Sequence, residues 1–122
     1  MTAENAVTMK TMLLCRPSDI PDGGTLALPA PPGSLTSLFA IRRGDIVLIY
    51  VNACPHLGVS LDWAPGAFLS SDGSHIVCAM HGAQFEIETG RCFAGPCIGE
   101  HLEKVPHQLE DGMIAVSCET GV

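Results

Sequence analysis

Positive charge is scarce in this sequence. Only 6 Lys and Arg residues stand against 13 Asp and Glu residues, so the formal net charge at pH 7 is −7. This balance argues against nucleic acid and anionic membranes as partners, because both attract clusters of Lys and Arg side chains. An acidic surface instead suits steering toward a basic patch on a partner protein, although acidity also serves solubility alone.

Long apolar runs are absent as well. No stretch approaches the roughly 20 apolar residues of a transmembrane helix. Residues 1–10 contain no charged leader followed by an apolar segment. We therefore expect a cytoplasmic protein without membrane contact. In the reducing cytosol, cysteines that bind nothing are expected to be free thiols.

The sequence also lacks internal repeats, low-complexity tracts and any clear amphipathic helix. Its 122 residues suffice for one domain with a modest core and leave no room for a second catalytic domain. Short apolar segments alternate with turns rich in Gly, Pro, Asp and Asn, a pattern typical of antiparallel strands. The sequence therefore predicts an all-β fold.

The clearest predicted hairpin joins residues 38–42 to residues 46–52 through the turn Arg43-Gly44-Asp45. Its second strand leads directly to Cys54, so we expect a rigid element to carry the loop that follows. Other strands are expected at residues 12–15, 67–69, 75–78, 85–87, 92–93, 102–108 and 113–118.

Two short motifs combine cysteine with histidine. Cys54-Pro55-His56 is a C-x-H pair and Cys78-Ala79-Met80-His81 is a C-x-x-H pair, and a glycine follows closely after each. Together they supply two thiolates and two imidazoles, whereas an all-cysteine iron–sulfur site needs four thiolates. Structural zinc also accepts two cysteines with two histidines. Zinc fingers, however, usually place both cysteines in one pair, and here each pair is mixed.

These motifs resemble those of the Rieske iron–sulfur family, in which two histidines replace two cysteines on one iron of a [2Fe–2S] cluster. Downstream, Gly95-Pro96 resembles the proline loop that covers the cluster in that family. The resemblance implies that Cys54 and Cys78 hold the inner iron. It assigns His56 and His81 to the outer, more exposed iron.

The resemblance also carries an expected architecture. It implies a small antiparallel β barrel or sandwich of the Rieske type, with the cluster-binding loops at one end. Residues 1–122 would form a single Rieske [2Fe–2S] domain, with a cluster-binding subregion at about residues 52–97. The segment between His56 and Cys78 is longer than is usual in the family. Closing a somewhat longer loop costs little free energy, so ligation should not suffer.

The function implied by the resemblance is that of a ferredoxin, a one-electron carrier and not an enzyme. Its protein partners would be a flavin-dependent reductase and a terminal oxygenase or similar acceptor. An oxygenase would need a second iron site with two histidines and a carboxylate. The remaining histidines, His75, His101 and His107, form no such spaced set. Two alternatives stay open: an iron–sulfur redox sensor and a zinc-stabilised interaction module.

Two positions indicate a low reduction potential within the family. High-potential relatives carry a serine and a tyrosine after the glycine of the second loop. Here these positions hold Ala83 and Phe85, which have no hydroxyl group to donate a hydrogen bond. Such donors stabilise the reduced state more, because that state carries the extra negative charge. We therefore expect a stand-alone, low-potential ferredoxin of the oxygenase type.

Four cysteines remain after the ligands: Cys15, Cys92, Cys97 and Cys118. Cys92 and Cys97 flank the proline-loop segment and could lie close enough for a disulfide, although the free thiol is the default expectation. Cys15 and Cys118 lie near opposite ends of the chain, and sequence alone does not show whether they touch.

Overall fold

The computed structural model describes residues 9–30, 36–55, 61, 68–78 and 82–119 of the chain. Within these residues it contains nine strands and one turn of 3₁₀ helix. In chain order they are β1 (Met9–Cys15), η2 (Pro17–Asp19), β2 (Thr25–Leu28), β3 (Leu38–Arg43), β4 (Ile46–Val51), β5 (Ile76–Val77), β6 (Gln84–Phe85), β7 (Cys92–Ala94), β8 (His107–Glu110) and β9 (Met113–Glu119). Among the described residues, no helix is long and apolar enough to cross a membrane.

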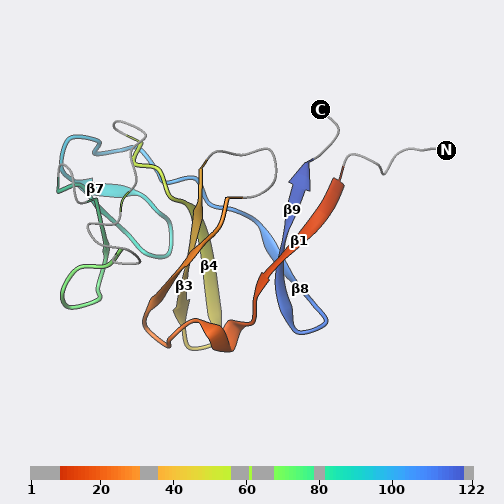
Figure 1. The fold of residues 1–122 in the computed structure, drawn as a ribbon. Coiled ribbons are helices and arrows are strands. Elements are labelled where there is room, and N and C mark those ends of the chain that lie inside the picture. The colour runs from red at the N-terminus through yellow and green to blue at the C-terminus, as the bar shows by residue number, and fades with distance from the viewer. Residues whose placement is uncertain (1–8, 31–35, 56–60, 62–67, 79–81, 120–122) are drawn as a thin grey trace.

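The strands form three antiparallel sheets, each with three strands. Their orders are β1–β9–β8, β2–β3–β4 and β5–β6–β7. In Figure 1 the β3–β4 pair lies between the sheet of β1, β8 and β9 on one side and β7 with its loops on the other. The predicted all-β class is confirmed, and the described strands form separate sheets instead of one closed barrel.

The predicted central hairpin is confirmed almost to the residue. β3 and β4 pair from Leu38 with Val51 to Arg43 with Ile46, and Gly44 takes a positive φ of 61° in the turn between them. β2 was not predicted, because it is short and a proline-rich stretch follows it. It pairs with β3, so β3 is the middle strand of its sheet.

The β3–β4 hairpin is buried on both faces. Successive side chains of a strand point to opposite faces, and here they enter two different cores. On one face, Phe39 and Tyr50 belong to the core that also contains Cys54 and Cys78. On the other face, Ala40 packs into a second core built with β1 and β9. The hairpin is therefore the shared support from which the cluster loops extend.

The two terminal strands are neighbours, but their cysteines are not. In the ladder between β1 and β9, Cys15 pairs with Ile114 and Lys10 pairs with Cys118. Cys15 and Cys118 thus stand toward opposite ends of this ladder.

Tyr50 joins the central hairpin to the turn between β6 and β7. Its hydroxyl donates a 2.6 Å hydrogen bond to the carbonyl oxygen of Ile87. Burial, together with the nearby carboxylate of Glu88, raises the pKa of Tyr50 to about 12, so the phenol remains a donor. A Cβ atom placed on Gly90 would lie 2.8 Å from Cε1 of the Tyr50 ring. Only glycine permits this close approach.

We expect Gly90→Ala to destabilise the fold more than Gly44→Ala. Both glycines have a positive φ, so each alanine costs about 1–2 kcal/mol in backbone strain. Only at Gly90 does the new methyl group collide with Tyr50, since nothing lies within 4 Å of a Cβ on Gly44. Overpacking adds roughly 1–3 kcal/mol. Urea denaturation measures both variants, and equal free energies of unfolding would contradict the packing argument.

Candidate metal centre

Cys54 lies shortly after the end of β4, as predicted, and its side chain is fully buried. Its neighbours in the core include aromatic side chains of the hairpin, among them Phe39 and Tyr50. Because β3 and β4 are paired along their whole length, the position of Cys54 is fixed by a rigid element. His56, the second residue of this motif, lies outside the described residues.

The side chain of Asn52 makes a hydrogen bond across the first loop. The backbone N–H of Leu61 donates a 2.7 Å hydrogen bond to Oδ1 of Asn52, while the N–H of Asn52 donates to the carbonyl of Ser37 at 2.9 Å. Asn52 is only 7% exposed and Leu61 is fully buried. The only signal of this residue in the sequence is a polar side chain between an apolar strand and the first motif.

Cys78 directly follows β5, and its side chain is also fully buried. Two backbone hydrogen bonds close the second loop. The N–H of Cys78 donates to the carbonyl of Ala83 at 2.8 Å, and the N–H of Gly82 donates to the carbonyl of Cys78 at 3.0 Å. β6 begins immediately afterwards, at Gln84. His81 lies outside the described residues.

The predicted proline-loop segment packs against the second loop. Gly95 has a φ of 100°, and a Cβ atom there would lie 2.7 Å from Cα of Ala83. The segment is held at its base, where the N–H of Cys92 donates to the carbonyl of Glu100 at 2.8 Å. Gly95 and Pro96 themselves are exposed. The structure therefore brings this segment to the second motif, as the resemblance implied.

Two further cysteines adjoin the site. The Sγ atoms of Cys92 and Cys97 are 3.2 Å apart, and both thiols are free and buried. The predicted proximity of this pair is confirmed, and in the structure the two form no disulfide. Cys97 also makes a side-chain hydrogen bond with Cys54. Burial, followed by the contacts with Cys92 and Cys54, raises the pKa of the Cys97 thiol to about 12.

The described half of the donor set fits an iron–sulfur centre. Cys54 and Cys78 each stand at the start of one of the two loops, share one core cluster and are not joined in a disulfide. A thiolate buried among apolar side chains needs a positive partner, and bound iron supplies one. The surrounding residues exclude water, since Ala83, Phe85 and Leu61 have no exposed surface.

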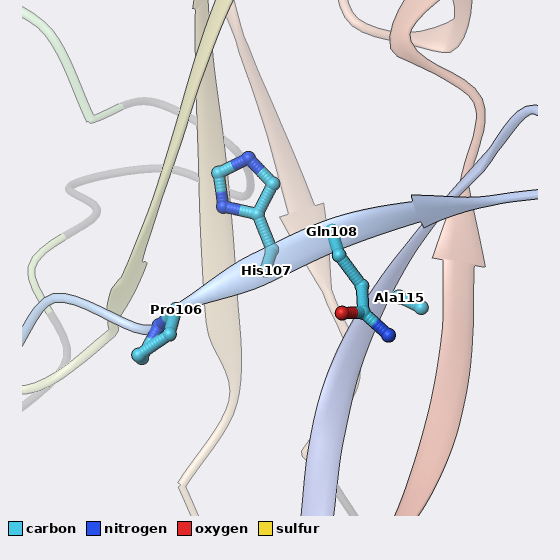
Figure 2. Close-up of a pocket in the computed structure, with 4 residues that line it drawn as sticks. All are labelled: Pro106, His107, Gln108 and Ala115. Carbon is cyan, nitrogen blue, oxygen red and sulfur yellow. The ribbon is translucent and has the colours of Figure 1, made fainter.

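The other histidines lie on different elements. His107 belongs to β8, where a hollow of about 80 Å³ is lined by Pro106, His107, Gln108 and Ala115. In Figure 2 His107 and Gln108 extend to opposite sides of the strand. A hollow of this size holds a few waters and no cofactor. His75 stands edge-on to Phe93, with ring centroids 5.5 Å apart.

Comparison with known proteins agrees with this geometry. The sequence model of the Rieske [2Fe-2S] domain matches residues 10–110. A ferredoxin from Sphingomonas yanoikuyae B1 has 26% identity and a TM-score of 0.68, over 88% of this chain and 97% of that one. No curated protein sequence matches the chain.

Two carbazole 1,9a-dioxygenase structures share the fold. One is a complex of reduced oxygenase and oxidized ferredoxin, in which the matched chain has 24% identity and a TM-score of 0.70, over 97% of this chain and 99% of that one. The other is the ferredoxin from Nocardioides aromaticivorans IC177, with 20% identity and a TM-score of 0.66, over 89% and 98%. The family match spans both cysteine–histidine motifs, the proline-loop segment and most of the strands. The chain belongs to the Rieske [2Fe-2S] domain family.

Proposed function

We propose that this protein is a ferredoxin that carries single electrons from a flavin-dependent reductase to a terminal oxygenase in the cytoplasm. Its [2Fe–2S] cluster would be held by Cys54, His56, Cys78 and His81. The observation that carries the proposal is the burial of Cys54 and Cys78 in one core, each at the start of a loop, with Gly95 packed on the second loop.

The cluster and the residues around it have separate roles. When bound, the cluster supplies a one-electron couple that makes and breaks no bond in a substrate. Buried Cys54, Cys78 and Phe85 hold the inner side of the site in an apolar, water-free environment. No second catalytic group is needed for this role.

The proline-loop segment supplies a contact surface for a partner. Phe93 and Ile98 stand on either side of it in the sequence and are 40% and 64% exposed. β7 and its loops lie on the side of the molecule away from β1 and β9 (Figure 1). The net charge of −7 suits long-range attraction to a basic partner surface. The rate of association should therefore fall as ionic strength rises.

A reconstituted electron-transfer assay tests this function. The purified protein should contain two iron and two acid-labile sulfide atoms per chain. In the presence of NAD(P)H, a flavin reductase of an oxygenase system should bleach its visible absorption. Oxygenase should then restore the absorption in air. Colourless protein containing zinc would overturn the proposal in favour of an interaction module, while red-brown protein that transfers no electron to any oxygenase would favour a sensor.

Asn52→Ala should weaken retention of the cluster. The substitution leaves the buried N–H of Leu61 without its acceptor, which costs about 1–3 kcal/mol. This loosens the loop that begins at Cys54. Ser37→Ala is the matched control, since it removes only the 3.4 Å contact with Nδ2 of the same asparagine. Iron release to a chelator should be faster in Asn52→Ala alone, and identical release from both variants would contradict the role of Asn52.

A further inference from the structure

The proposed ligand Cys54 has a neighbour that the resemblance does not assign. Cys97 follows the Gly95–Pro96 segment in the sequence and is 1% exposed. Its thiol is in hydrogen-bonding contact with Cys54 on one side, and on the other its Sγ donates a 3.2 Å hydrogen bond to Sγ of Cys92. The proline-loop segment thus ends in a thiol that touches a metal ligand.

A thiol carries one hydrogen, so Cys97 can donate to only one of these two sulfurs at a time. In the structure that hydrogen is directed to Cys92, whose own hydrogen is directed to the carbonyl oxygen of Ala94, 3.1 Å away. Cys54, when it binds iron, is an anionic thiolate that can only accept. Hydrogen bonds to charged acceptors are roughly twice as strong as those between neutral groups.

We propose that, when Cys54 binds iron, the Cys97 thiol turns its hydrogen from Cys92 to Sγ of Cys54 and thereby favours the reduced state of the centre. This inference rests on the proposed function, because it requires Cys54 to be a ligand. It assigns Cys97 as a positioning and tuning residue that binds no metal. It also gives the proline-loop segment a polar contact with the first motif, in addition to its packing on the second.

The physical basis is the extra negative charge of the reduced state. That charge is shared with the ligand thiolates, so a donor to a thiolate stabilises the reduced state more than the oxidised state. The site of Cys97 is buried, where electrostatic interactions are screened less than in water. Removing the S–H group should therefore make reduction harder.

The reduction potentials of the wild type and of two Cys97 variants test the proposal. In Cys97→Ala the equilibrium for reduction should become about threefold to tenfold less favourable, where tenfold corresponds to about 59 mV for one electron. Cys97→Ser keeps a donor and should remain at or above the wild-type potential. Cys15→Ala is the matched control, since Cys15 is a buried free thiol in the other core. Its potential should equal that of the wild type.

Infrared spectroscopy gives a signal that would not change if Cys97 only supported the fold. The S–H stretching band of Cys97 should shift to lower frequency when the centre is reduced, and the shifting band should be absent from Cys97→Ala. Measurements are made on samples with intact clusters and titrated free thiols. Unchanged potential in Cys97→Ala, or an equal fall in Cys97→Ser, would overturn the inference while leaving the ferredoxin assignment intact.

Two other outcomes also count against the donor role. If both Cys97 variants fail to assemble iron while Cys15→Ala succeeds, Cys97 is itself needed to bind the metal or to build the fold. If the wild-type protein holds no iron, the proposed function and this inference fail together.

Discussion

Replacing any one of the four proposed ligands is expected to remove the bound iron and the visible absorption of the protein. The ligands are Cys54, His56, Cys78 and His81. Even a change in an outer-shell group that only orients a ligand lowers metal affinity by about 10–100-fold, so the loss of a ligand should exceed that range. Cys54→Ser is the most informative substitution, because it preserves the size of the side chain and changes only the donor atom.

The chain supplies a control within the same core. Cys92 is as buried as Cys54 and lies in the same cluster, yet it occupies neither of the two mixed motifs. Cys92→Ser should therefore keep two iron atoms per chain, measured by iron analysis and visible absorption. Iron loss in Cys92→Ser, together with iron retention in Cys54→Ser, would show that the ligand assignment is wrong.

Local features of the sequence predicted the support of this site well. The β3–β4 hairpin follows from two apolar runs and a glycine turn, and its register needs no information from distant residues. β9 is also predicted locally, from a run of apolar residues that follows a turn containing Gly112. Both motifs are also local, since each is only a few residues long.

Features that depend on distant partners could not be predicted. β2 is a short strand, and it owes its identity to pairing with β3. Asn52 matters because its side chain meets the N–H of Leu61, and Cys97 matters because the fold brings it to Cys54. Such contacts depend on how loops close in three dimensions. Side-chain hydrogen-bond partners far along the chain leave no periodic signal in the sequence.

A low reduction potential, near −150 mV at the low end of the Rieske range, is the second large expected effect. High-potential relatives join their two loops by a disulfide, at positions that hold Val59 and Met80 here. They also donate hydrogen bonds from a serine and a tyrosine, where this chain has Ala83 and Phe85. A hydrogen bond to a charged group is worth about 1.5–3 kcal/mol. For a one-electron couple, each hydroxyl can therefore raise the reduction potential by at most roughly 65–130 mV.

The structure shows that solvent does not reach these two positions. Ala83 and Phe85 are fully buried, and a Cβ on Gly95 would lie 3.2 Å from Cβ of Ala83. Neither position admits water that could take the place of a hydroxyl donor. The Cys97 thiol is a weak donor, so it offsets only part of the effect of the two missing hydroxyls. A carrier with this potential can accept electrons from a flavin reductase but is unsuited to oxidising quinol.

Protein-film voltammetry on the wild type and on Ala83→Ser with Phe85→Tyr tests this expectation. The double variant should have a higher potential, because both new hydroxyls stabilise the more negative, reduced state. The shift should stay below the sum of the two limits, since only the difference between oxidation states counts. Phe39→Tyr is a suitable control, because it adds a buried hydroxyl to the same core from β3, away from the second loop. A wild-type potential well above zero, or a double variant with no shift, would show that missing hydroxyl donors do not set the potential of this centre.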